Sequence, residues 1–157
     1  MKRRFAQGAL ILQLALWPLA ALSQQATGDG DVIVENLWAR ATPSGNKAAA
    51  VYLTIRNTGQ NQIDLIGVRT DRASIETLHK TTTDAQGSVR MSALANLWIA
   101  PGETVTLEPG GLHVMLLDLD TPLIEGETLP LRLKFYDGDD LTVIVPILPS
   151  DATGPQP

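Results

Sequence analysis

The sequence predicts an all-β domain, built as a two-sheet β-sandwich or a small Greek-key barrel. The chain of 157 residues is rich in Val, Ile, Leu and Thr and contains 13 Gly and 10 Pro, a mixture typical of short strands joined by tight turns. Turn signals recur at roughly 8–12-residue intervals, which is the spacing of sandwiches and barrels. No stretch of helical length has an apolar period of 3.6 residues.

Nine strands are expected between the turns. Two of them alternate clearly between apolar and polar residues, as expected for strands that cover one face of a core. The side chains expected to face the core are Val51, Leu53 and Ile55 in one strand and Leu131, Leu133 and Phe135 in the other. The nine predicted strands are Val32–Thr42, Lys47–Asn57, Gln62–Arg69, Ser74–Thr82, Ser88–Ala93, Thr104–Glu108, Leu112–Leu119, Leu129–Tyr136 and Leu141–Leu148.

The two ends of the chain are expected to lie outside this domain of residues 32–148. Residues 1–23 have a basic start, an apolar stretch without charge and a small residue at Ser23, which is the pattern of a cleaved secretory signal peptide. The apolar stretch is shorter than the ~20 residues of a membrane span, so we expect no stable membrane insertion. Residues 24–31 are expected to be a flexible leader, and the polar residues 149–157 a disordered tail.

Charge and cysteine content exclude several classes of function. Beyond residue 23 the chain has 9 basic and 17 acidic residues, a net charge of −8, which argues against binding to nucleic acid. The chain has no Cys, which excludes a lipid anchor on cysteine, a disulfide framework and a blue-copper centre. No arrangement of nucleophile, base and acid suggests an enzyme.

The residues that could carry chemistry lie in one window. The only two His are His79 and His113, and the only Met residues beyond the expected signal peptide are Met91 and Met115. Imidazole and thioether together are ligands that suit Cu(I). His113 and Met115 are spaced i, i+2 on a predicted strand, so both side chains point to the same face.

The turn between the other two residues decides whether they share that face. If the loop is Ala85-Gln86-Gly87, with Gly87 in the left-handed conformation, Asp84 lies opposite Ser88. His79 and Met91 then become diagonal neighbours on one face. A loop of two or four residues would place them on opposite faces. Taken singly, a Met in a strand is usually core filling and a lone His is usually a surface or satisfied residue. The gathering of all four residues in one region, two of them on one strand face, favours a metal site instead.

The same window resembles a known family. His79, Met91 and, after 21 further residues, His113-Val114-Met115 are similar to the metal motif of the periplasmic copper chaperones of the PCu(A)C type. The stretches Leu37–Pro43, Ala49–Ile55 and Pro109–Leu116 also resemble that family. One departure is that eleven residues separate His79 from Met91, where the family usually has ten, so a longer turn or a bulge is expected here.

The resemblance implies a cupredoxin-like Greek-key fold and one Cu(I) bound by His79, Met91, His113 and Met115. It also implies a periplasmic carrier that delivers copper to an apo-protein, such as a cytochrome oxidase subunit with a CuA site or its assembly factor. Two alternatives remain at this point: a secreted Ig-like adhesion or assembly module without a metal, and a copper redox enzyme, for which the chain offers few His. The acidic run Asp137–Asp140 lacks the Glu of a calcium loop and is expected to be a hairpin turn.

Overall fold

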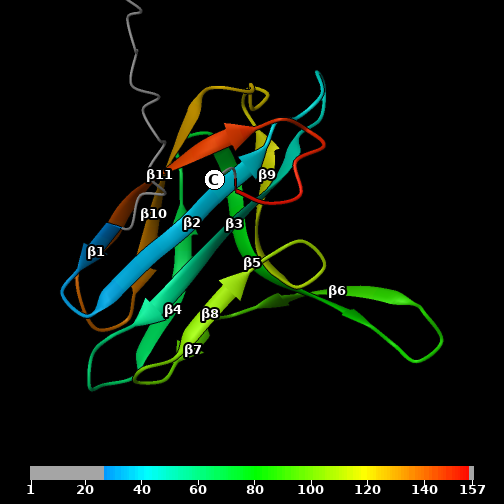
Figure 1. Cartoon of the computed structure of the whole chain (residues 1–157). Coiled ribbons are helices and arrows are strands. Elements are labelled where there is room, and N and C mark those ends of the chain that lie inside the picture. The colour runs from blue at the N-terminus through cyan, green and yellow to red at the C-terminus, as the bar shows by residue number, and fades with distance from the viewer. Residues whose placement is uncertain (1–26, 156–157) are drawn as a thin grey trace, which may run out of the picture.

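The computed structural model describes residues 27–155, and this part of the chain is all β (Figure 1). The nine predicted strands are present with ends within two residues of those expected, and two short strands, β1 and β7, were not predicted. No helix of the described residues is long and apolar enough to cross a membrane. The strands are β1 (Thr27–Asp29), β2 (Val32–Arg40), β3 (Ala48–Asn57), β4 (Ile63–Arg69), β5 (Ala73–Thr83), β6 (Val89–Leu94), β7 (Leu97–Ile99), β8 (Thr104–Leu107), β9 (Leu112–Leu119), β10 (Thr128–Phe135) and β11 (Leu141–Leu148).

The strands form two packed layers that β11 joins. One layer has the order β6-β5-β9-β3-β2, with β1 beside β2 and β8 beside β3, and the other has the order β11-β10-β4-β7. Most of β11 pairs with β10, but Ile147 and Leu148 run parallel to the end of β2. The inward side chains of both layers make one apolar core, which includes Val51, Leu116 and Leu131. This is the sandwich architecture that the alternating strands predicted.

The start of the described chain is more ordered than the sequence predicted. Within the expected flexible leader of residues 24–31, Thr27–Asp29 pair with Val32–Val34 of β2. Gly30, with φ of 59°, lies in the tight turn between them. A three-residue strand with polar composition carries no periodic signal of its own, so only its pairing with β2 reveals it. The expected signal peptide, residues 1–23, lies outside the described residues.

The C-terminal segment also differs from the disordered tail that was expected. Ala152 is buried against Trp38 and Tyr52, whose rings stack with centroids 4.4 Å apart. The Arg40 Nε donates a hydrogen bond of 2.7 Å to the carbonyl of Ala152. The two aromatic rings lie outside the main core, and Ala152 in the segment after β11 helps to cover them.

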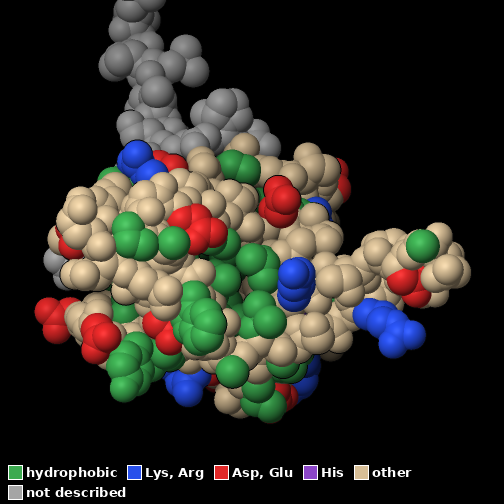
Figure 2. All heavy atoms as spheres, turned by 90° about the horizontal axis from the view of Figure 1, so that it is seen from below, with side chains coloured by type: hydrophobic (Ala, Val, Ile, Leu, Met, Phe, Trp, Pro, Cys, Tyr) green, Lys and Arg blue, Asp and Glu red, His purple; other side chains and the backbone are tan. Residues whose placement is uncertain are grey.

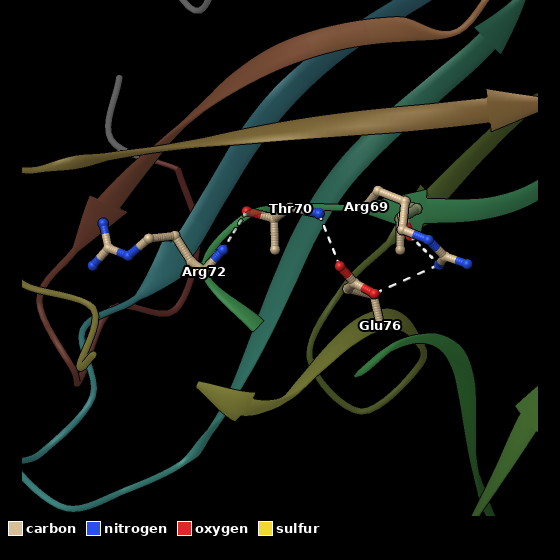
Figure 3. Close-up of polar contacts among 5 residues, drawn as sticks. Arg69, Thr70, Arg72 and Glu76 are labelled. Atoms are coloured by element: carbon tan, nitrogen blue, oxygen red, sulfur yellow. Dashed lines mark hydrogen bonds and ion pairs between the residues drawn. The ribbon is translucent and has the colours of Figure 1, made fainter. Parts of the chain in front are cut away.

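A polar network fixes the turn that leads into β5. The Thr70 backbone N–H donates to Glu76 Oε1 at 2.9 Å, and the Arg69 guanidinium lies 3.5 Å from the other oxygen of that carboxylate (Figure 3). The Arg72 backbone N–H donates to the Thr70 hydroxyl at 3.4 Å. The Glu76 side chain is only 6% exposed, whereas the Arg69 side chain is 60% exposed, so the carboxylate is buried and the guanidinium remains in contact with water. Glu76 lies on β5 three residues before His79, so the network anchors the part of β5 that leads to His79.

Candidate metal centre

Strand β9 supplies two of the four predicted ligands. His113 and Met115 point to the outer face of the sheet, while Val114 and Leu116 between and after them are fully buried in the core. The strand is held on both sides, by β3 and by β5. The spacing of i, i+2 therefore places both side chains on one face of a rigid strand, as the sequence predicted.

Strand β5 places the third residue directly beside the first. His79 is the register partner of His113, and the two rings meet edge to face with centroids 5.8 Å apart. Thr77 is the register partner of Met115 in the same pairing. Directly opposite residues of antiparallel strands share a face, so His79 joins the two β9 side chains.

The β5–β6 hairpin brings in the fourth residue. Asp84 donates its backbone N–H to the Ser88 carbonyl at 3.0 Å, and Gly87 closes the turn with φ of 83°. The loop is thus the three-residue type, and the register pairs Thr81 with Met91 and His79 with Ala93. The prediction that His79 and Met91 are diagonal neighbours on one face is confirmed. Beyond this loop the register of β5 and β6 runs without a shift from Thr83 opposite Val89 to Leu78 opposite Leu94.

Exposure varies strongly among the four side chains. His113 is 5% exposed, while Met91 on the outermost strand is 54% exposed. His79 and Met115 lie between these extremes. The site therefore has a buried end on β9 and an open end on β6, and any ion bound there would be reached from the side of Met91.

The backbone selects the tautomer of His113. Its Nδ1 lies 3.1 Å from the carbonyl oxygen of Gly111. A carbonyl oxygen only accepts hydrogen bonds, so Nδ1 carries the proton and donates it. The lone pair of neutral His113 is then on Nε2, which is free to bind a metal. Orientation of a ligand His by a backbone carbonyl in this way is usual around metals.

Two polar atoms on β5 are buried and have no hydrogen-bond partner among the described residues. They are the Nδ1 of His79 and the hydroxyl oxygen of Thr77, and both belong to residues opposite the predicted ligands on β9, His113 and Met115. An unsatisfied buried polar atom costs about 1–3 kcal/mol. A metal ion on His79 would use one such atom. Thr77 was not singled out from the sequence, although its position two residues before His79 placed it on the same face.

The environment of His79 also shifts its titration. Burial first, and then the charge of neighbouring His113, lower the pKa of His79 below its ordinary value of 6.5. Both causes disfavour the imidazolium form, because it would be poorly solvated and would face a like charge. The ring therefore stays neutral, and able to bind a metal, to a lower pH than an exposed His.

This shift predicts a pH dependence for the stability of the metal-free protein. In the unfolded chain His79 takes up a proton near its ordinary pKa of 6.5, whereas in the folded chain it does so only at lower pH. The free energy of unfolding should therefore fall as the pH drops from about 6.5 toward the lower folded value. Urea unfolding between about pH 5 and 8 measures this, and His79→Gln should reduce the slope. An unchanged slope in the variant would contradict the shift.

In the part of the chain that the structure describes, no other metal site competes with this face. Within residues 27–155, no group of three or more His, Asp or Glu side chains is placed to hold a metal ion. The acidic run Asp137–Asp140 forms the turn between β10 and β11, where Lys134 pairs with Asp140 at 3.7 Å. Calcium binding there is not supported. The candidate centre thus has two imidazoles and two thioethers, a soft ligand set.

The two Trp residues of the folded domain have different roles. Trp38 is 3% exposed and packs in the small cluster with Tyr52 and Ala152. That cluster includes partly buried Ala50, the register partner of Met115, so it continues the same sheet face. Trp98 on β7 is 64% exposed and pairs across the strands with Asp64 in the other layer. Of the two, Trp38 alone lies on the sheet face of the predicted metal ligands.

Comparison with known proteins places this arrangement in a family. The family model described as "Putative lipoprotein LpqE-like" matches residues 32–147, which is nearly all of the described chain. The chain belongs to the LpqE-like family. Solved relatives of this family member are PCuAC domains, so the resemblance noted from the His and Met residues is confirmed. The expected cupredoxin-like β fold is confirmed with it.

Two curated proteins are similar in sequence. A protein of Leifsonia xyli subsp. xyli named "Putative lipoprotein Lxx21020" is 34% identical over 130 residues, covering 83% of this chain and 76% of that protein. A Rickettsia prowazekii protein, named only as uncharacterized protein RP573, is 27% identical over 114 residues and covers 70% and 62% of the two chains. The name of the Leifsonia protein includes the word lipoprotein, whereas the present sequence contains no Cys to which a lipid could be attached.

Solved structures support the fold. The apo PCuAC domain of PmoF2 superposes with a TM-score of 0.71 at 23% identity, covering 83% of this chain and 99% of that domain. The solution structure of CuI-DR1885 from Deinococcus radiodurans gives a TM-score of 0.60 at 32% identity, covering 81% and 83% of the two chains. The Deinococcus protein was therefore solved in its Cu(I) form.

Proposed function

We propose that this protein binds one Cu(I) through His79, Met91, His113 and Met115 and carries it to an acceptor protein. The observation that carries the proposal is that these four side chains lie on one face of three adjacent strands, β6, β5 and β9, with His79 directly opposite His113 and diagonal to both Met residues. They are the only His and Met residues beyond position 23. A pair of imidazoles and a pair of thioethers suits Cu(I) better than Mg²⁺ or Ca²⁺.

The relatives support the same assignment. The Deinococcus protein, 32% identical, is named as a Cu(I) form, and a further solved relative is named as a copper-bound PCuAC domain. The family is one of copper-binding carriers and not of enzymes. A carrier must also release its ion. Neutral thioethers bind copper less firmly than thiolates, and the 54% exposed Met91 gives a partner access to the ion.

The compartment and the acceptor are part of the proposal. Residues 1–23 would act as a signal peptide that sends the protein to the periplasm, where an exported acceptor meets it. Names of relatives that include "lipoprotein" agree with export. The CuA site of cytochrome oxidase, or an assembly factor for it, is the acceptor that the family resemblance suggests.

The test is a competition titration of residues 24–157 with Cu(I) against a chromophoric chelator. We expect one equivalent to be withdrawn from the chelator, because the face offers one set of four ligands. A protein that withdraws no copper would favour the Ig-like adhesion module instead. Two or more tight equivalents would contradict the single site.

A further inference from the structure

Strand β6 is a free edge that stands out from the body of the protein. It ends the sheet and pairs with β5 alone among the described strands. The outer half of the hairpin extends beyond β9, whose pairing with β5 ends at Lys80, and it projects from the molecule in both views (Figures 1 and 2). Val89 is 67% exposed and Met91 is 54% exposed. Exposed edges of this kind readily pair with another strand.

The hairpin register decides which backbone groups are free along this edge. The hydrogen bond from Asp84 N–H to the Ser88 carbonyl makes these two a hydrogen-bonded pair. Such pairs alternate along an antiparallel ladder, so Arg90 and Ser92 bond to β5. The N–H and C=O groups of Val89, Met91 and Ala93 therefore point outward. The free edge is centred on Met91, one of the proposed ligands.

We propose that β6 is a docking edge for β6 of a second copy of this chain, paired antiparallel with Met91 opposite the partner's Met91. In this register Val89 lies opposite the partner's Ala93, and all three outward residues find hydrogen-bond partners. The two metal-binding faces then form one continuous surface, with the two Met91 Cα atoms about 5.5 Å apart. Copper could pass between copies at this point. The proposal rests on the proposed function for its role in copper handling.

A second copy matches this edge in length and charge. The free residues are symmetric about Met91, which is the requirement for a two-fold pairing of a strand with itself. Arg90 would lie opposite the partner's Ser92, so like charges are not opposed. The segment from Lys80 to Met91 has two cations and one acid, Asp84, within a chain of net charge −8 beyond residue 23. The contacting segment of each copy thus carries a net charge of only +1, so two copies meet there without opposing the negative charge of the rest of the chain.

The contact area of one strand pair is small compared with the ~1,200 Å² of stable interfaces. The pairing is therefore weak and transient, as suits exchange between carriers. The pairing depends on the backbone groups of β6. A substitution can therefore disrupt it without changing any of the four proposed metal ligands. The docking edge and the copper site can for this reason be tested separately.

Cross-linking tests the register directly, because the chain has no Cys of its own. A copper-free mixture of Val89→Cys and Ala93→Cys chains is oxidised, and the mixed disulfide is expected at least about fivefold above either symmetric one. In the proposed pairing the mixed Cys Cα atoms are about 5.5 Å apart, within disulfide range, whereas two copies of Val89 are about 14 Å apart. Ile75→Cys, exposed on β5, gives the rate of random collision. If the mixed and the two symmetric disulfides formed in equal yield, and no faster than the disulfide of Ile75→Cys, the proposal would be overturned.

A second variant removes one outward hydrogen bond without touching the hairpin ladder. Val89→Pro deletes an N–H that points away from β5, which an edge strand tolerates, and Val89→Ala is the matched control that keeps it. Sedimentation equilibrium should give weak association for wild type and Val89→Ala, and at least about a fivefold weaker one for Val89→Pro. Equal association of all three would overturn the docking edge. A Cu(I) titration of Val89→Pro should still show one bound equivalent of copper. If neither wild type nor Val89→Pro bound copper, the proposed function would be wrong, whereas the docking edge would be judged by the association measurements alone.

Discussion

Met115→Ala is expected to weaken Cu(I) binding by at least about a hundredfold, and His113→Ala by at least as much. Changing even the groups that orient a metal ligand commonly costs about 10–100-fold in affinity, and each of these variants removes a proposed ligand outright. Both side chains leave the outer face of β9, while Val114 and Leu116 keep the strand in the core. Competition with a Cu(I) chelator measures the loss, and circular dichroism checks that each variant is folded.

Leu117→Ala is the matched control for these two variants. Leu117 follows Met115 by two residues, so it lies on the same face of the same strand, and its register partner on β5 is Ile75. Its truncation removes a comparable volume and no metal ligand. Copper affinity should stay within about threefold of wild type. If Leu117→Ala weakened copper as much as Met115→Ala, the effect would be one of strand packing, and the ligand assignment would be wrong.

The ligand face could be predicted from sequence because it depends on parity. In a strand, residues two apart share a face whatever the rest of the fold does, so His113 and Met115 were placed together at once. The face of Met91 is harder to predict, because one residue more or less in the β5–β6 loop would move Met91 to the face opposite His79. Gly87 resolved it, since a three-residue loop places a glycine in the left-handed conformation, and Gly87 has φ of 83°.

The features that could not be predicted depend on contacts between distant segments. β7 has three residues and exists because Leu97–Ile99 pair with β4. The direct contact of the two His rings depends on the register of β5 against β9, which no local turn sets. Ala152 is buried because the stacked rings of Trp38 and Tyr52 need cover. Composition described the C-terminal segment correctly as polar, but burial there is decided by its neighbours.

The site is graded from a fixed end to an open end. His113 is nearly buried and held by the Gly111 carbonyl, whereas Met91 lies on a projecting strand with one neighbour among the described strands. A rigid, buried side chain is already held in position for binding, so it loses little conformational freedom when an ion binds. An exposed side chain loses more freedom on binding, so a group from another protein replaces it more readily. The gradient fits the proposed carrier function, in which β9 would retain the ion and β6 would exchange it.

The opposite face of β9 predicts the second large effect, in stability instead of affinity. Leu116→Ala should lower the free energy of unfolding by about 2–5 kcal/mol, because Leu116 is fully buried in the core and its truncation leaves a cavity. Cu(I) affinity of the folded variant should change by less than about threefold, since the adjacent Met115 points the other way. Urea unfolding and chelator competition on one sample measure both. Together with Met115→Ala, which should keep most of its stability and lose copper, the pair separates the two faces of one strand. A loss of copper affinity in Leu116→Ala equal to that in Met115→Ala would mean that the backbone of β9 shifts with its core contacts, and the rigidity assigned to the strand would then be wrong.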